Sequence, residues 1–156
     1  MTVQRSLRGA LAGGVAAGVW AAQQPLDKRV FGTRYDDVEL LGKFVTRGDR
    51  WLPAGVALHV QNGLLFGAVY AQVKPFLPGP PVLRGVAAGL AEHVASWPLT
   101  RFSDRYHPAR RDLEKLDGNW RAFAQAAWRH ALFGAVLGAL EHALNDRSAD
   151  EPPEIP

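Results

Sequence analysis

The chain has 156 residues, of which 47% are hydrophobic, with a net charge of +3 and no cysteine. This length suits one domain or two small repeats, and the lack of cysteine excludes disulfides, thiolate metal sites and cysteine nucleophiles. The sequence contains no phosphate-binding loop, nucleophile elbow or dinucleotide-binding glycine motif, so we do not expect classical catalysis.

Four apolar segments follow one another along the chain. They are residues 9–26, the stretch between Arg50 and Lys74, the stretch between Arg84 and Arg101, and residues 122–144. A bilayer span needs about 20 residues at a rise of about 1.5 Å each, and the second segment meets this with 23 uncharged residues. We therefore predict an all-α fold, a four-span transmembrane helical bundle.

Polar connectors separate the first segment from the second and the third from the fourth. Both contain apolar residues at helical spacing, which predicts short amphipathic helices at the membrane interface; solvated linkers are the alternative. The residues are Val38, Leu41, Phe44 and Val45 in the first connector, and Pro108, Leu113, Leu116 and Gly118, as start, apolar face and end of a helix, in the second.

The two halves of the chain resemble each other. Gly14-Val-Ala-Ala-Gly18 recurs as Gly85-Val-Ala-Ala-Gly89 at an offset of 71, and Leu65-Phe-Gly-Ala-Val69 recurs as Leu132-Phe-Gly-Ala-Val136 at an offset of 67. We predict two tandem helical hairpins, residues 1–77 and 78–145, followed by a disordered acidic tail, residues 146–156. Two spans per half give both halves the same orientation, with a pseudo-two-fold axis along the membrane normal.

Lysine and arginine gather in the two connectors, each of which holds six of them. The positive-inside rule then predicts that both connectors are cytoplasmic and both termini outside. The residues are Lys28, Arg29, Arg34, Lys43, Arg47 and Arg50 in the first, and Arg101, Arg105, Arg110, Arg111, Lys115 and Arg121 in the second.

Each apolar segment contains two glycines four residues apart. Such a pair forms a smooth strip on one helix face where another backbone can approach closely, whereas each glycine costs a soluble helix about 1 kcal/mol. We predict that these pairs pack the helices together: Gly14 and Gly18, Gly63 and Gly67, Gly85 and Gly89, and Gly134 and Gly138.

Polar side chains accompany the glycine strips. They are costly in a membrane and should face the bundle interior, so we predict a polar intramembrane centre. Glu92 has His59, His93, His130 and Arg129 as possible partners, and a Glu–His pair can relay protons, bind a cation or coordinate a metal. The alternative is that these groups only hydrogen-bond across helices. The predicted centre comprises His59, Asn62, Glu92, His93, His130, Glu141 and His142.

One series of motifs covers residues 54–100: His59-x-x-Asn62, Phe66-x-x-Val69-Tyr70, Pro75, Gly85-x-x-x-Gly89-Leu90, His93 and Pro98-Leu99. It resembles the YagU family of small bacterial inner-membrane proteins. The resemblance implies a helical inner-membrane protein, associated in enteric bacteria with acid tolerance. The connectors here are more basic, and Glu92 stands where a neutral residue is expected.

Three functions remain open. The first is a multi-pass protein of the bacterial inner membrane that serves membrane or pH and acid-stress homeostasis. The second is a membrane redox protein that binds haem or a metal, although neighbouring Glu–His pairs fan out by about 100° on a helix and disfavour a di-metal site. The third is a soluble helical interaction domain. We expect no cofactor, the lipid bilayer as partner, a homodimer if the glycine strips face lipid, and no nucleic acid.

Overall fold

The computed structural model describes residues 3–146 of the chain, and every regular element among them is helical, which confirms the all-α prediction. The remaining predicted tail, residues 147–156, lies outside the described residues. The helices are α1 (Val3–Phe31), α2 (Asp37–Val45), α3 (Trp51–Val73), α4 (Pro81–Ser96), α5 (Thr100–Tyr106) and α6 (Trp120–Asn145), with short 3₁₀ turns at Lys74–Phe76 and Trp97–Leu99.

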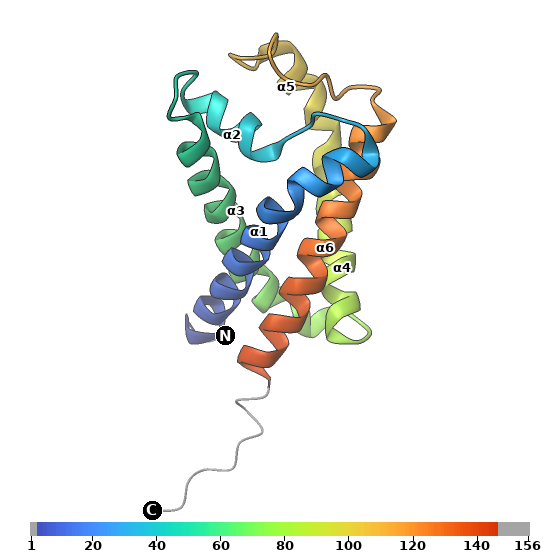
Figure 1. Cartoon of the computed structure of the whole chain (residues 1–156). Coiled ribbons are helices and arrows are strands. Elements are labelled where there is room, and N and C mark those ends of the chain that lie inside the picture. The colour runs from blue at the N-terminus through green and yellow to red at the C-terminus, as the bar shows by residue number, and fades with distance from the viewer. Residues whose placement is uncertain (1–2, 147–156) are drawn as a thin grey trace, which may run out of the picture.

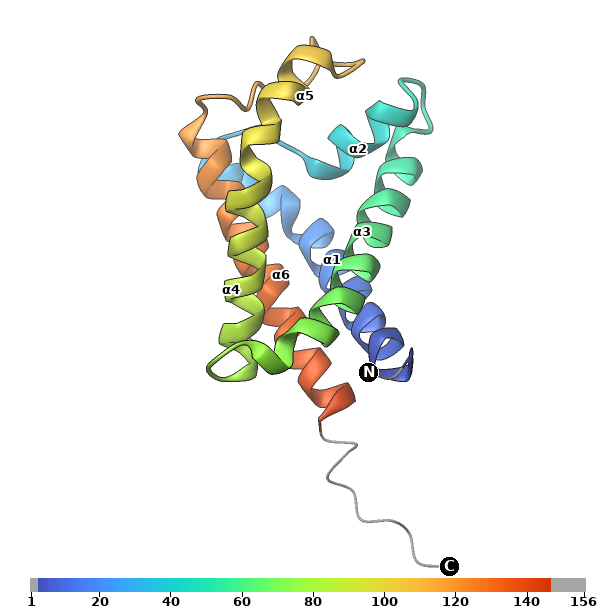
Figure 2. The same cartoon turned by 180° about the vertical axis from the view of Figure 1, so that it is seen from behind.

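The four long helices run lengthwise through the molecule, alternately in opposite directions (Figure 1). α1 begins and α6 ends at one end, while α2, α5 and both connectors lie at the other. α1 packs against α3 and α6, and α4 packs against α6, whereas α3 and α4 make little contact and diverge towards the connector end (Figure 2). The division into two repeats stays a prediction.

The first connector forms the predicted helix, α2. Asp36 caps its N-terminus by accepting a hydrogen bond from the backbone N–H of Glu39 at 2.9 Å. α2 then lies against the start of α3, where Gly42 meets the carbonyl of Trp51 and Gly55 meets that of Val38 so closely that a Cβ on either glycine would overlap.

The helix predicted from Pro108 to Gly118 is wrong, because these residues form turns and the second connector's helix, α5, lies earlier. Polar side chains bind the backbone groups that such a helix would use. The Asp104 carboxylate accepts the N–H of Leu116 at 3.0 Å, and His107 Nδ1 accepts the N–H of Ala109 at 3.0 Å.

Glycines mediate the two closest helix contacts, between α4 and α6 and between α1 and α3. A Cβ on Gly85 or Gly134 would overlap the carbonyl of the other, and a Cβ on Gly63 or Gly67 would overlap the backbone of α1. These strips, with Gly89 against the carbonyl of His130 and Gly138 against that of Pro81, therefore face other helices of the same chain.

On α1, Gly9 and Gly13 make the contact, in place of the predicted Gly14 and Gly18. Gly14 meets the side chain of Leu64, and Gly18 has nothing within 4 Å of a Cβ position. A helix turns by about 100° per residue, so the choice between the adjacent Gly13 and Gly14 decides which face packs. The repeat offset selects Gly14 and thereby points to the wrong face.

One described helix, α3 with its 3₁₀ extension (Trp51–Phe76), is long and apolar enough to cross a membrane. The other long helices carry charges or many small residues, which lower their mean hydropathy. The four-span arrangement and the multi-pass location therefore stay predictions.

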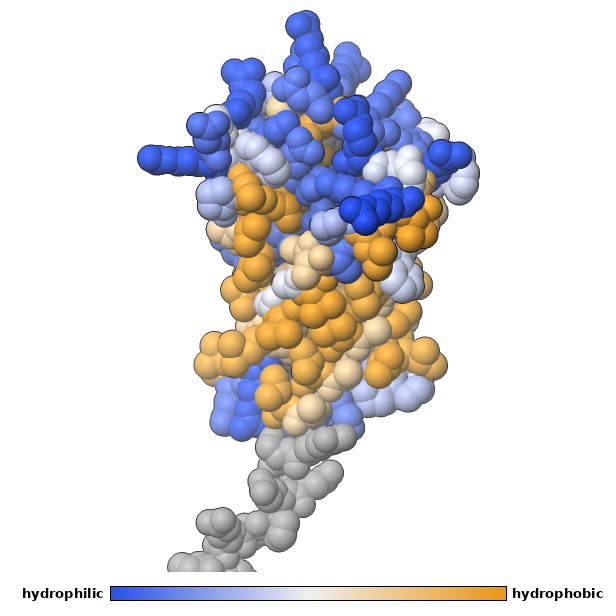
Figure 3. Space-filling model, in the orientation of Figure 1, coloured by the Kyte–Doolittle hydropathy of each residue, from blue (hydrophilic) through white to orange (hydrophobic). Residues whose placement is uncertain are grey.

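The molecule buries polar groups and exposes aliphatic ones. Leu7, Leu11 and Val15 on α1 are 61%, 62% and 55% exposed, and apolar side chains cover much of the visible face below the connector end (Figure 3). The interior contains alanines and glycines together with charged side chains. The largest fully buried side chains include Arg129, Lys74, Gln125, Glu141 and Asp27.

Candidate functional site

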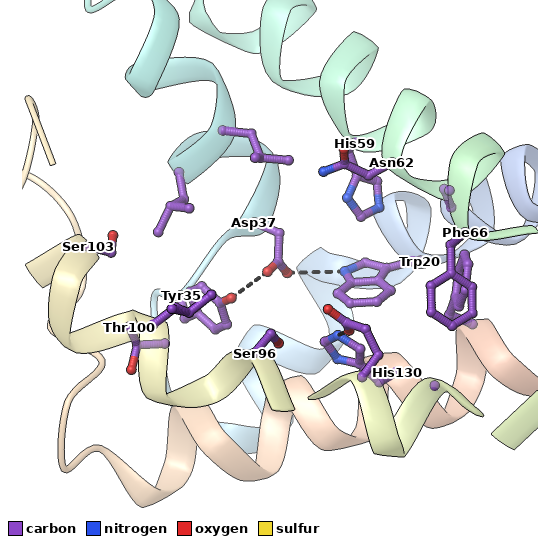
Figure 4. A pocket seen from close by; sticks show the side chains of 18 of the residues that line it. Trp20, Tyr35, Asp37, His59, Asn62, Phe66, Ser96, Thr100, Ser103 and His130 are labelled. Carbon is purple, nitrogen blue, oxygen red and sulfur yellow. Dashed lines mark hydrogen bonds and ion pairs between the residues drawn. The ribbon is translucent and has the colours of Figure 1, made fainter. Parts of the chain in front are cut away.

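A cavity of about 480 Å³ lies between α3 and α4 at the connector end. α1 and α6 contribute Trp20 and Phe133 to its lining, and α2 and α5 contribute Leu40 and Ser103 (Figure 4). Its volume is typical of small-molecule sites. The divergence of α3 from α4 creates this space.

Asp37, the first residue of α2, points into the cavity (Figure 4). Its carboxylate accepts hydrogen bonds from the Tyr35 hydroxyl at 2.5 Å and from the Trp20 indole N–H at 3.1 Å. The start of α2 adds the positive end of a helix dipole, which favours an anion at this position.

Arg129 on α6 lies behind Asp37 and is completely buried. Its Nη1 donates to Asp37 at 2.6 Å, while its Nε and Nη2 donate to the two oxygens of Asp27 at 2.6 and 2.7 Å. Gln125 donates to Asp27 at 2.6 Å. One guanidinium therefore joins α1, α2 and α6, with one negative charge in excess over the three groups.

The environment sets the ionisation of Asp37 and Tyr35. Burial opposes the charged form of Asp37, but Arg129 and the Tyr35 hydroxyl outweigh it and lower the pKa of this carboxyl. Burial, the charge of Asp37 and the hydrogen bond to it raise the pKa of Tyr35 well above its usual value. Asp37 is thus held as a carboxylate and Tyr35 as a neutral donor.

Glu92 and His130 form a pair across the α4–α6 contact, with 2.6 Å between Oε2 and Nε2. His130 Nδ1 lies 2.7 Å from the carbonyl oxygen of Ala126. Both ring nitrogens therefore face acceptors, and a neutral imidazole carries only one N–H. The pair must hold a further proton, either on the imidazole or on the Glu92 carboxyl. The Glu92 side chain is 41% exposed, so this proton is accessible from the cavity.

Three other predicted residues lie at the same end. His59 and Asn62 on α3 line the cavity, and the His59 ring meets that of Trp20 edge-on at 5.1 Å. His93 is buried beside the cavity, with its ring 4.9 Å from that of His130. The structure thus brings together five of the predicted residues: His59, Asn62, Glu92, His93 and His130.

Glu141 and His142 are not part of this centre. They lie about three turns further along α6, about 16 Å away, at the end where the chain's described part begins and ends (Figure 1). The buried Glu141 pairs with Lys74, and His142 Nδ1 is 2.7 Å from Asp146. His130, Gly134, Gly138 and His142 form one row on the same face of α6. Because this row is about three turns long, its two ends cannot belong to one site.

Asp27, Tyr35, Asp37 and Trp20 were not predicted as site residues. Asp37 and Tyr35 belong to a connector that was interpreted only through its basic charge and its apolar spacing. Arg129 was considered as a partner of Glu92 but binds the two aspartates. The sequence does contain an acid on each of the two helices that bind Arg129, Asp27 on α1 and Asp37 on α2. It does not reveal that these helices pack against Arg129.

No group of three or more histidine, cysteine, aspartate or glutamate side chains within residues 3–146 is arranged to hold a metal ion. Comparison with protein-family models, with curated proteins and with solved structures finds no match for the chain. The site must therefore be interpreted from its own geometry.

Proposed function

We propose that this chain is a multi-pass protein of the bacterial inner membrane that serves membrane or pH homeostasis through its titratable cavity. The observation that supports it best is the inverted distribution of polarity. Aliphatic side chains project outward from the long helices, while arginine, lysine and aspartate are buried and paired. Water favours the opposite arrangement, and a bilayer requires this one.

The pairing of buried charges and the lengths of the helices support four membrane spans. Asp27 of α1 and Arg129 of α6 pair inside the bundle, and Glu141 of α6 pairs with Lys74. α4 has only 16 residues, but the turn Trp97–Leu99 and α5 follow it without interruption. Because the connectors carry most of the lysine and arginine at one end of the molecule, the positive-inside rule assigns that end to the cytoplasm.

The Glu92–His130 pair gives the cavity its role in this proposal. If the pair loses its further proton, two acceptors face each other, either Nε2 and Glu92 at 2.6 Å or Nδ1 and the Ala126 carbonyl at 2.7 Å. Histidine exchanges protons near neutral pH. The resemblance to the YagU family, with its association with acid tolerance, points to the same role.

Membrane fractionation tests the location. The full chain, expressed in a bacterium with a C-terminal fluorescent fusion, should remain in the membrane pellet after an alkaline wash. Release into the soluble fraction would overturn the membrane proposal and favour a helical interaction domain.

Proton movement tests the role. Vesicles that contain the purified protein and a pH-sensitive dye should acidify faster than protein-free vesicles after a drop in external pH. Glu92→Gln should reduce the rate to that of protein-free vesicles. Glu39→Gln is the matched control, because Glu39 pairs with Lys43 on α2 and does not line the cavity. An unchanged rate in a folded Glu92→Gln variant would assign Glu92 to interhelical hydrogen bonding alone.

A further inference from the structure

We infer that the cavity binds a hydrophobic organic cation, such as a lipophilic amine or a quaternary ammonium or phosphonium ion. This inference deepens the proposed function, since it names the ligand class of the same cavity. It depends on the charge of the lining, the aromatic wall and the route of entry.

The charged side chains that line the cavity are acidic. Asp37 and Glu92 are its two carboxylates, and no lysine or arginine is among the described lining residues. The buried cluster of Arg129, Asp27 and Asp37 keeps one uncompensated negative charge. An anionic ligand would meet no lysine or arginine here, whereas a cation would meet the Asp37 carboxylate and, once the Glu92–His130 pair has lost its further proton, the Glu92 carboxylate as well.

The remaining titratable groups around Glu92 are one tyrosine, one aspartate and three histidines. Tyr35 lies just before α2, Asp37 is on α2, His59 is on α3, His93 is on α4 and His130 is on α6. His130 is the only one of these in contact with Glu92 in the described chain. When its imidazole is neutral and Glu92 ionised, a bound cation can replace the missing proton. Proton and cation therefore compete for the same carboxylate.

The wall is aromatic and apolar. Trp20 and Phe133 stack edge-on with ring centroids 6.0 Å apart, and Phe66 meets Phe133 at 5.4 Å. The faces of such rings attract cations. The remaining lining combines aliphatic side chains, among them Leu40, Leu41 and Leu99, with uncharged polar and glycine residues. The aliphatic side chains suit the hydrophobic substituents of a large cation rather than a metal ion.

One buried polar atom of the cavity lining also lacks a hydrogen-bond partner within residues 3–146. Nε2 of His59, a residue 7% exposed, makes no well-formed hydrogen bond, although the backbone of Ala17 lies beside it. His59 lies on the side of the cavity that α3 forms, opposite His130 (Figure 4). A ligand entering between α3 and α4 would pass between these two residues. Since the outer faces of these helices expose Leu65, Val69 and Val94, that route leads from an apolar surface.

Tetraphenylphosphonium is a suitable probe, because tetraphenylborate has nearly the same size and the opposite charge. We expect titration of the purified protein in an uncharged detergent to show saturable binding of tetraphenylphosphonium, with quenching of tryptophan fluorescence. Tetraphenylborate should bind at least about tenfold more weakly. Equal binding of the two ions would overturn the inference, since it would indicate hydrophobic uptake without charge selection.

Glu92→Gln should weaken tetraphenylphosphonium binding at least about tenfold, while Glu39→Gln should leave it unchanged. Lowering the pH should weaken binding to the wild type and not to Glu92→Gln. If Glu92→Gln fails to fold, the comparison of the two ions on the wild type still decides the matter. Wild-type affinity that is insensitive to both pH and the substitution would contradict a site at Glu92.

The two proposals can fail separately. Proton leak in vesicles without tetraphenylphosphonium binding would overturn the ligand inference alone. Binding without proton leak would retain the ligand site and overturn the proposed role in proton handling.

Discussion

The contact of α1 with α6 is closed, whereas the gap between α3 and α4 opens into the cavity (Figure 2). The predicted repeat, which aligns α1 with α4 at an offset of 71 and α3 with α6 at an offset of 67, would make these two helix pairs equivalent. A symmetric bundle would close both or open both. The difference therefore arises from the residues at corresponding positions.

The Arg129–Asp27 ion pair joins α6 to α1 at the connector end. The same offsets place Asn62 opposite Pro98 in the open pair, and neither side chain can reproduce a bidentate ion pair. Phe66 and Phe133 correspond to each other at the offset of 67, and their rings meet edge-on at 5.4 Å. The helix pair with the buried ion pair is thus closed, and the pair without it lines the cavity.

The largest expected effect follows from removing the guanidinium. Arg129→Met leaves Asp27 and Asp37 buried without their cation, and breaking a buried ion pair in this way costs about 3–5 kcal/mol. Thermal unfolding in detergent, followed by circular dichroism, should show this loss. Arg121→Met, at an exposed position of the same helix, is the control and should change little.

A second substitution separates this effect from a loss of helix packing. Adding Asp27→Leu to Arg129→Met removes one of the two uncompensated carboxylates, while the other, Asp37, keeps its bonds to Tyr35 and Trp20. We expect part of the lost stability to return. If Arg129→Met alone were as stable as the wild type, the ion pair would not explain the closed contact.

A smaller effect is expected at the glycine contacts. A Cβ on Gly134 would overlap the carbonyl of Gly85, so Gly134→Ala must push α4 and α6 apart, at a cost of about 1–3 kcal/mol. Gly18 has open space around it, and Gly18→Ala should stabilise α1 by about 0.4–1 kcal/mol. Denaturant titration of both variants measures the difference, and a loss of stability in Gly18→Ala would show that α1 uses the predicted strip after all.

The sequence predicted the four long helices and α2, because apolar runs and helical spacing are local features, but it placed the helix of the second connector at Pro108–Gly118 instead of at α5. It placed α3 at its observed limits and brought His59, Glu92 and His130 to one end of the bundle. It did not predict Asp37, since a connector aspartate acquires its role only when α2 folds back over the bundle. Nor did it separate Glu141 from His130. A row of glycines indicates which face of a helix packs, but not where along the helix a site lies.

The smallest effect concerns the side of Asp37 that faces the cavity. Tyr35→Phe removes the hydroxyl that donates to Asp37 at 2.5 Å. A hydrogen bond to a charged group contributes about 1.5–3 kcal/mol to stability. Because Tyr35 is partly exposed, solvent screening reduces this contribution to about 1 kcal/mol. Because the pKa of Tyr35 is raised on folding, the wild type should keep this stability below about pH 10 and lose it as the pH rises through the folded-state pKa. Tyr35→Phe should therefore be less stable at neutral pH and show a shallower decline above pH 10 or so, as measured by chemical denaturation across that range. Tyr106→Phe, at an exposed tyrosine, should follow the wild-type curve. If Tyr35→Phe matched the wild type throughout, the hydrogen bonds from Arg129 and Trp20 alone would keep Asp37 ionised. The charge of this cavity carboxylate would then depend on the ion-pair cluster at the α1–α6 contact.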